Sequence, residues 1–191
     1  MNLTKPAGVR TVAIALLLTL VAILAACSSV RLISDYDEET DKQLTALKKL
    51  SDTHFTAMFA ELPMSKPDAR SAKNAYDSKK GFYSDFSEKL TQLEFRAQSM
   101  PKNSQTVDLL GKLRAATLLS ESSLEICETS GLPDDDPKTD LSSLQAIHCL
   151  KSNKAQGAKR AVLVPSQRNI DQLIGQALAL ELKKKMGADS K

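Results

Sequence analysis

The stretch YDSKKGFYSDFSEKLTQLEFRAQSM, residues 76–100, decides the fold class of the chain. Its mostly apolar positions recur at alternating steps of three and four residues: Tyr76, Lys79, Tyr83, Phe86, Leu90, Leu93, Ala97 and Met100. This spacing places the side chains on one face of an α-helix. Pro67 lies before the stretch and Pro101 directly follows it, so the sequence predicts one long helix that ends at Met100.

Apolar stripes with helical spacing also occupy the segments on both sides. Toward the N-terminus, a first helix is expected to begin at Ser34, because Ser34 and Asp37 stand at the positions of a capping box. Glu38 and Glu39 follow in the first turn, where the helix dipole favours acidic side chains. Pro63 ends this helix.

Toward the C-terminus, the spacing predicts a third helix that begins at Asn103 or Ser104 and leads to Cys127. Its buried face includes Leu124 and Ile126 at the C-terminal end. A short fourth segment is expected after Asp140, which can cap it. The polar residues 152–160 are expected to form a connection.

The last helix is expected to begin at Pro165 and Ser166 and to stop at Gly187. Its inward face is predicted to include Leu180 and to extend toward Met186. The lysines at 183–185 occupy its last turn, where the helix dipole favours cations, and are interpreted as a solvated helix end.

These segments together predict an all-α protein. No segment alternates with a period of two, as a half-buried strand would, and no repeat of fixed length is evident. The expected fold is an elongated antiparallel bundle of three long helices plus one or two shorter ones over residues 34–187. Residues 188–191 are expected to form a flexible tail.

The N-terminal segment has the composition of a targeting sequence. Lys5 and Arg10 precede an apolar run over residues 12–26 that only Thr19 interrupts. As a helix, such a run spans ~22 Å, which is short of the ~30 Å hydrocarbon core of a membrane. The sequence therefore predicts a secretory signal peptide over residues 1–26, with an uncleaved membrane anchor as the alternative.

The apolar run closes as Leu24-Ala25-Ala26-Cys27, which resembles the lipobox of bacterial lipoproteins. The resemblance implies cleavage between Ala26 and Cys27, thioether diacylation of Cys27 and acylation of the new amino terminus. Residues 27–33 would then form a tether of at most ~20 Å between the lipid and the bundle. Ser28 follows the acceptor where an Asp would favour the inner membrane, so the enterobacterial sorting pattern implies the outer membrane.

Removal of the signal peptide also removes the apparent basicity of the chain. The full chain has 26 basic and 23 acidic side chains, and the loss of Lys5 and Arg10 leaves 24 against 23. This balance gives no argument for binding to nucleic acid, and no nucleic-acid partner is expected.

Two cysteines remain once Cys27 is acylated. Cys127 and Cys149 flank a segment rich in Gly, Pro and Asp, and in an oxidising compartment they are expected to form a disulfide that closes it. Such a loop would stabilise the fold by ~3 kcal/mol. The alternatives are two separate buried thiols, or a metal site with His148, which lacks the usual spacer between ligands.

No other motif predicts chemistry. His54 and His148 are the only histidines, and His54 is interpreted as a partly buried structural residue. The acids at 134–136 with Asp140 can hold Ca²⁺, but their spacing is not that of an EF-hand and favours a solvated turn. We therefore predict no catalytic residue, no cofactor and no metal ligand.

Two further resemblances are local. Lys191, after the small residues 187–190, is similar to the C-terminal lysine by which the major outer-membrane lipoprotein is joined to peptidoglycan. Residues 36–47 and 178–183 resemble small uncharacterised proteobacterial lipoproteins that carry an acidic helix start soon after the acylated cysteine. These likenesses imply a helical architecture and, for Lys191, an attachment to the cell wall.

The expected function is that of a non-enzymatic protein, held in the cell envelope by lipid at Cys27 and facing the periplasm. It would act as a structural or interaction subunit with an envelope protein as partner. The alternative is a binding module that holds a small apolar ligand or acyl chain between the stripes at Phe82 and Phe86 and at Phe55 and Phe59. An envelope enzyme that depends on His54 or His148 comes third.

Overall fold

A computed structural model describes residues 34–134 and 142–189, which belong to one compact unit. These residues form helices and no β-strand, apart from an isolated bridge between Leu132 and Leu150. The predicted all-α helical bundle is confirmed. Its four longest helices are α2 (Glu38–Ala60), α3 (Tyr76–Ser99), α4 (Ser104–Thr117) and α8 (Arg160–Asp189).

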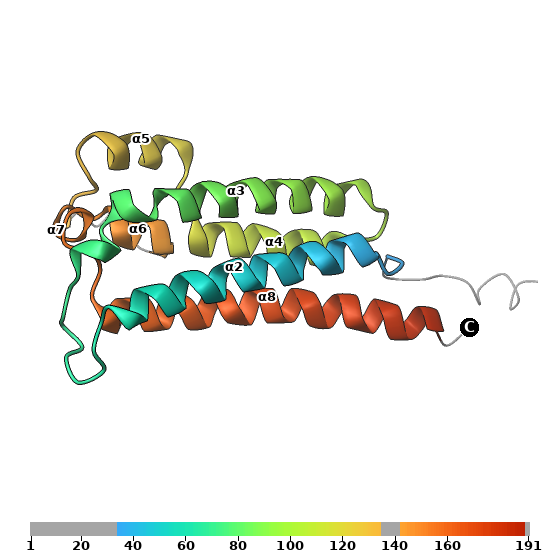
Figure 1. Cartoon of the computed structure of the whole chain (residues 1–191). Helices are drawn as coiled ribbons and strands as arrows, with labels where there is room; N and C mark the ends of the chain where they lie inside the picture. The colour runs from blue at the N-terminus through green and yellow to red at the C-terminus, as the bar shows by residue number, and fades with distance from the viewer. Residues whose placement is uncertain (1–33, 135–141, 190–191) are drawn as a thin grey trace, which may run out of the picture. The chain divides into compact units, whose positions relative to one another are not determined.

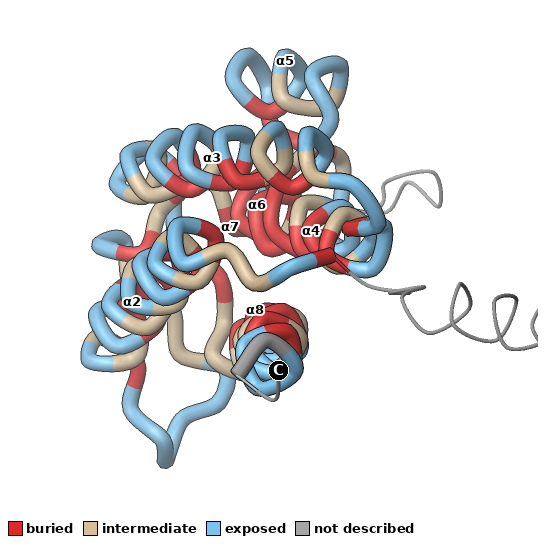
Figure 2. Tube along the Cα trace, turned by 90° about the vertical axis from the view of Figure 1, so that its right-hand side faces the viewer, coloured by how far each residue is buried: buried red, intermediate tan, exposed pale blue. Residues whose placement is uncertain are grey.

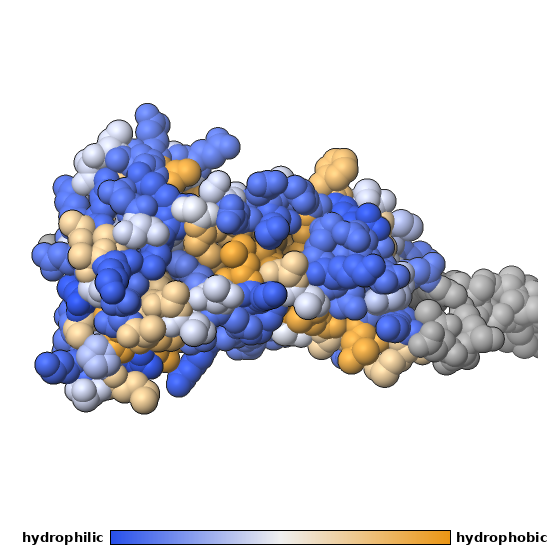
Figure 3. All heavy atoms as spheres, in the orientation of Figure 1, coloured by the Kyte–Doolittle hydropathy of each residue, from blue (hydrophilic) through white to orange (hydrophobic). Residues whose placement is uncertain are grey.

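The four helices run antiparallel in chain order: α2 and α4 point one way along the bundle, and α3 and α8 point the other way (Figure 1). Helix α2 packs against α3 and α8, and α4 packs against the same two helices, so the four form a closed ring. Figure 2, which looks along the helices, shows that buried positions face the centre of this ring and exposed positions face outward. The face shown in Figure 3 is largely hydrophilic, with smaller apolar areas between the charged side chains.

The stripe that predicts α3 forms its buried face. Six of its members are buried: Tyr76, Tyr83, Phe86, Leu90, Leu93 and Ala97. They meet Leu44, Leu47, Phe55 and Met58 of α2, and Leu110 and Leu113 of α4. The periodicity of α3 therefore specifies both the helix and the side of it that faces the core.

The first helix begins later than predicted. Its N-cap is Asp37, whose carboxylate accepts a hydrogen bond from the Thr40 amide at 3.0 Å. The prediction of a cap at Ser34 is wrong because Ser34 packs against the turn after α3, where its amide donates to the Lys102 carbonyl at 3.1 Å. Asp37 is also held by Arg96, whose Nη2 donates to Asp37 Oδ1 at 2.6 Å.

The predicted third helix is two helices. Helix α4 ends at Thr117, Leu118 and Ser120 have extended backbone conformations, and α5 (Glu121–Thr129) begins after Ser120. The break arises because the Ser120 side chain accepts from the Ser123 amide and the Leu119 amide donates to the side chain of Gln145. Because α5 does not continue the helical periodicity of α4, Ile126 faces outward and is 47% exposed rather than buried.

Helices α6 (Leu144–Cys149) and α7 (Lys151–Lys154) connect α5 to α8, together with residues 155–159. The predicted cap Asp140 lies outside the described residues. The N-cap of α6 is Ser143, whose hydroxyl accepts from the Ala146 amide at 3.0 Å. The predicted connection over 152–160 thus includes most of a short helix.

Helix α8 also differs from its predicted limits. It begins at Arg160, and Pro165 lies inside it. The loop between α2 and α3 supports the earlier start, since Arg160 donates to the Leu62 carbonyl and the Ala161 amide donates to the Pro67 carbonyl. At the other end the helix continues through Gly187 to Asp189, so the predicted stop at Gly187 is wrong.

Candidate functional site

A cleft of about 690 Å³ opens between α3, the junction of α4 with α5, and α6. We call it the α3–α5 cleft. Most of the residues that line it have hydroxyl or charged side chains, and Leu118, Leu119 and Leu124 add apolar surface. The cleft can therefore accommodate a ligand that combines a polar group with a small apolar group.

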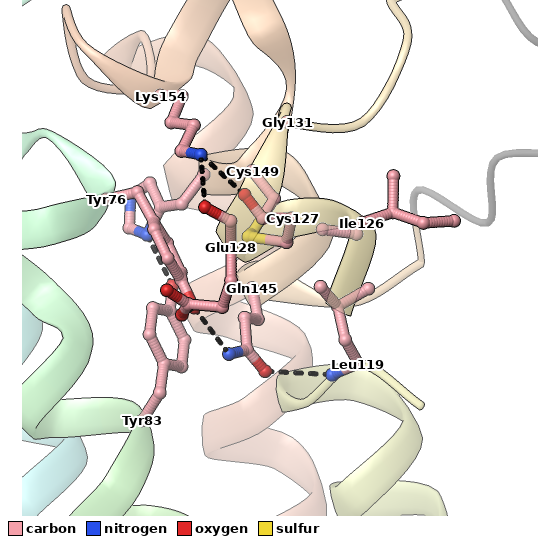
Figure 4. The surroundings of a disulfide bond; sticks show 12 residues. Tyr76, Tyr83, Leu119, Ile126, Cys127, Glu128, Gly131, Gln145, Cys149 and Lys154 are labelled. Atoms are coloured by element: carbon pink, nitrogen blue, oxygen red, sulfur yellow. Dashed lines mark hydrogen bonds between the residues drawn. A yellow bond between two sulfur atoms is a disulfide. The ribbon is translucent and has the colours of Figure 1, made fainter. Parts of the chain in front are cut away.

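One wall of the cleft, helix α5, is attached to the bundle by a disulfide. Cys127 is the only buried residue of α5, and it is bonded to Cys149 at the end of α6, with the two Cα atoms 5.3 Å apart. The predicted disulfide is confirmed, and with both sulfurs bonded to each other these cysteines are not metal ligands. Lys154 of α7 adds a second attachment, since Nζ donates to the Cys127 carbonyl at 2.6 Å (Figure 4).

The turn after α5 brings the chain back to α6. Gly131 has φ of 78°, and a Cβ there would lie 3.2 Å from the Cys149 carbonyl oxygen. The next amide, of Leu132, donates to that carbonyl at 2.8 Å, and the Lys151 amide donates to the Leu132 carbonyl at 2.9 Å. Glycine at 131 thus allows α5 to be closed against the end of α6.

The floor of the cleft is a chain of hydrogen bonds that joins four parts of the fold (Figure 4). The Leu119 amide donates to Gln145 Oε1 at 2.9 Å, and Gln145 Nε2 donates to Tyr76 Oη at 3.3 Å. Tyr76 Oη in turn donates to Glu128 Oε1 at 2.8 Å. Burial, with a further contribution from Glu128, raises the pKa of Tyr76 to about 12, so the phenol stays protonated and holds this geometry.

The two cations that line the cleft are already paired. Lys80 contacts Glu128 at 2.6 Å and Asp77 at 2.9 Å, and its hydrogen bond to Glu128 is the largest of the effects that raise the pKa of Lys80. Arg114 contacts Glu94 at 2.7 Å and donates to the Thr91 hydroxyl at 2.8 Å. These pairs tie α3 to α5 at one end of the cleft and to α4 at the other.

The remaining charged groups give the cleft an acidic character. Glu88 and Glu121 line it in addition to Glu128, and the hydroxyls of Ser84 and Ser87 lie along the α3 side. Because the lining cations are neutralised by carboxylates, the cleft attracts positive charge and offers hydrogen-bond acceptors. Sequence reasoning missed this site, since it depends on the break in the third helix that sets α5 across from α3.

Both histidines lie in the core and outside the lining of the cleft. His148 is fully buried and its Nδ1 is hydrogen-bonded to Tyr83 Oη, while the His54 ring stacks on Phe82 at 3.5 Å. Burial lowers the pKa of His54 to about 2 and that of His148 to about 3, so both rings are neutral. His54 is buried against other rings, as a structural residue is.

The opposite end of the bundle contains a buried ion pair between Lys184 and Glu181, so the predicted solvated helix end is wrong for Lys184. Lys184 is 4% exposed, and its Nζ donates to Glu181 Oε1 at 2.5 Å. Lys183 and Lys185 are exposed, as expected for a solvated helix end. The signal was present in the sequence: Ile170, Ile174, Ala177, Glu181 and Lys184 continue one stripe at steps of four and three.

The acidic turn is described only at its first residue. Asp134 accepts hydrogen bonds from the Ser152 amide and from its hydroxyl, the latter at 2.6 Å. Asp135, Asp136 and Asp140 lie outside the described residues. Among residues that the structure does describe, no three His, Cys, Asp or Glu side chains gather to hold a metal ion.

The predicted anchor is likewise outside the described part: Ala26, Cys27, the signal segment and Lys191 all belong to residues that it omits. In the part that is described, no helix is both long enough and apolar enough to cross a membrane.

The fold and the cleft define a four-helix bundle in which a disulfide holds a short helix across one end. Comparison of the chain with protein-family models, with curated proteins and with solved structures finds no match.

Proposed function

We propose that the chain is a lipid-anchored protein of the cell envelope that faces the periplasm and binds another envelope protein through the α3–α5 cleft. The anchor would be Cys27, exposed by cleavage after Ala26, and Ser28 favours the outer membrane over the inner one. The role proposed is one of binding, without catalysis.

The observation that carries this proposal is the attachment of α5. A helix of nine residues whose only buried side chain is a disulfide cysteine has little apolar contact to hold it once the bond is reduced. Disulfides persist in exported proteins and are rare in the reducing cytosol. The way this cleft is built therefore supports an oxidising compartment, in agreement with the signal peptide and lipobox pattern.

The chemistry of the cleft supports a basic protein segment as the ligand. Glu88 and Glu121 offer carboxylates, Ser84 and Ser87 offer hydroxyls, and Leu124 offers a small apolar surface. A lysine or arginine of the partner would pair with the carboxylates, and charge complementarity of this kind selects the partner and speeds association. The same acidic character opposes binding to nucleic acid.

The packing of the core argues against an apolar ligand within the bundle. Phe55 and Phe86 are fully buried, and Phe82 lies between Phe86, at 5.5 Å, and the stacked ring of His54. Phe55 in turn contacts Phe59, with ring centroids 6.0 Å apart. The aromatic stripes thus pack on neighbouring rings, and the cleft is the better candidate for a binding site.

Photo-crosslinking in living cells tests the proposed partner. A photoreactive residue at Ser87, which lines the cleft, is compared with one at Lys49, an exposed position on α2. We expect one dominant protein adduct from Ser87 that is absent from Lys49 and lost when Glu88 and Glu121 are both changed to Lys. Equal adducts at the two sites, or a dominant adduct that survives the charge reversal, would contradict the proposal.

A further inference from the structure

The start of the described chain is fixed at one end of the bundle. This end, which we call the Ser34 end, is formed by Ser34, the turn between α3 and α4, and the last turns of α8. Ser34 is buried, and its hydroxyl donates to Asn103 Oδ1 at 2.9 Å. Asn103 Oδ1 also accepts from Lys184 Nζ at 2.6 Å, so the chain start is tied directly to α8.

In this polar network, every donor of the Lys184 ammonium group has an acceptor. The three hydrogens of the Lys184 ammonium are matched by Asn103, by Glu181 and by Thr106 Oγ1, the last at 3.0 Å. An ammonium group has three donors, so the lysine is held in one position and the residues that contact it are held as well. Ser34, at which the described chain begins, is therefore held beside the last turns of α8.

The outer face of α8 beside this point is apolar. Because Glu181 and Lys184 face the core, Leu182 and Met186 face outward, and each is 56% exposed. They are four residues apart and so lie on one side of the helix, with the exposed side chains of Ala179 and Lys183 next to them. Figure 3 shows apolar surface on α8 toward this end. We call these four residues the outer α8 face.

We infer that the outer α8 face lies against the lipid surface to which the chain is anchored, an inference that rests on the proposed acylation of Cys27. Six residues lie between Cys27 and Ser34, and the seven steps from one Cα atom to the other span at most ~25 Å when fully extended. Leu182 and Met186 are each only two residues from Lys184, which is ~3 Å along the helix axis. The acyl chains and this face are therefore confined to the same neighbourhood.

The chemistry of the face fits a membrane surface. Leu182 and Met186 offer apolar side chains to the boundary between headgroups and acyl chains, and Lys183 offers a cation to lipid phosphate. Lys185, whose Nζ lies 5.4 Å from the centre of the Tyr36 ring, adds a second cation on the same two turns. An amphipathic helix face of this kind binds weakly alone, and the covalent anchor supplies the local concentration that makes the contact stable.

The chain contains no tryptophan, which allows a direct test. A single Trp is placed at Met186 and, as a matched control, at Met64, an exposed methionine in the loop between α2 and α3. The full chain is produced in a host that acylates lipoproteins and is reconstituted into vesicles of phosphatidylethanolamine and phosphatidylglycerol. Trp emission and its quenching by brominated acyl chains are measured, and flotation and the mass of the N-terminal peptide report the anchor.

We expect Met186→Trp to shift its emission to the blue in vesicles and to be quenched by roughly half, while Met64→Trp behaves as in water. Leu182→Trp gives the same readout from the neighbouring position if the first variant is poorly produced. Vesicle-bound, acylated protein in which Trp at 186 and 64 emit alike would overturn the inference and leave the anchor intact. A blue shift at 186 that depends on protein concentration without vesicles would assign the face to a second copy and would also overturn it.

Failure of the anchor itself has a different signature. Unacylated protein that does not float with the vesicles would overturn the proposed anchor and, with it, the inferred contact.

Discussion

At the scale of single residues, the pair of Lys184 and Glu181 places two charged side chains in the buried part of the bundle. Two charges are removed from water at the Ser34 end, and only full pairing offsets the desolvation of each. Lys184 has all its donors satisfied, whereas Glu181 Oε2 has no hydrogen-bond partner among the described residues. The pair fixes the register of α8 against Asn103 and Thr106 of the neighbouring turn and helix.

Replacing the buried lysine is expected to destabilise the fold strongly. Lys184→Met leaves the Glu181 carboxylate buried without its partner, and we expect it to lower the free energy of unfolding by ~3 kcal/mol. Lys183→Met, at the exposed neighbouring lysine, is the matched control and should change it by less than ~0.5 kcal/mol. Urea unfolding of the two variants measures the difference, and equal effects would show that Lys184 is not buried as described.

The two histidines predict how stability depends on pH. Their pKa values are lowered to about 2 for His54 and about 3 for His148, from about 6.5 in the unfolded chain. Below pH 6.5 the unfolded state binds protons that the folded state does not, so stability falls as the pH falls. The slope expected from the pair rises to about 2.7 kcal/mol per pH unit as the pH falls well below 6.5, and it declines again near the folded-state pKa values.

A single substitution separates the two contributions. His54→Phe keeps a ring in the stack on Phe82 and removes one titrating group, so we expect the slope between pH 6 and pH 5 to be about halved. The measurement is urea unfolding of both proteins at pH 7, 6 and 5. An unchanged slope would mean that His54 is not buried in its neutral form.

At the scale of the helices, the sequence correctly predicts a helix that has a buried apolar stripe along its whole length. It misplaces a helix whose end is set by a hydrogen bond to a residue far away in the sequence. Residues 76–100 carry an unbroken stripe, and α3 forms where expected. The segment after Thr117 also carries apolar residues at helical spacing, yet its helix is broken because Gln145 takes up the Leu119 amide. That contact joins residues 26 positions apart, and no local pattern encodes it.

Helix α5 is therefore expected to depend on its disulfide. In the double variant Cys127→Ser and Cys149→Ser, the loop constraint is lost and we expect the free energy of unfolding to fall by ~3 kcal/mol. Amide hydrogens of residues 121–129 should exchange much faster, while those of α2 and α8 keep their relative protection. Hydrogen exchange followed by mass spectrometry measures both, and undiminished protection of α5 would show that its other contacts suffice.

At the scale of the whole molecule, the described unit has two distinct ends. The disulfide, α5 and the start of the α3–α5 cleft lie at the Tyr76 end of α3, while Ser34 and the buried pair lie at its Met100 end. A helix of 24 residues separates these ends by ~36 Å. The cleft therefore begins at the end of the bundle remote from Ser34, where the described chain starts.

The sequence predicts the fold class and the disulfide of the molecule, but it does not predict the α3–α5 cleft. The fold class follows from the helical periodicity of the apolar residues. The disulfide follows because Cys127 and Cys149 are the two cysteines that remain once Cys27 is acylated. The cleft does not, because Lys80, Glu121 and Gln145 are brought together from three helices by the break at residues 118–120. A site assembled from long-range contacts leaves no spacing pattern in a single sequence.

Intact-mass spectrometry of the chain purified from the cell membrane fraction tests the central claim most directly. It reports cleavage, acylation and the disulfide in one measurement, with Cys27→Ala as the unacylated control. We expect a chain that begins at Cys27, carries acyl groups there and retains the bond between Cys127 and Cys149, and an unprocessed, unacylated chain from the control. A membrane-bound wild-type chain that retains residues 1–26, with all 3 cysteines as free thiols, would contradict the account.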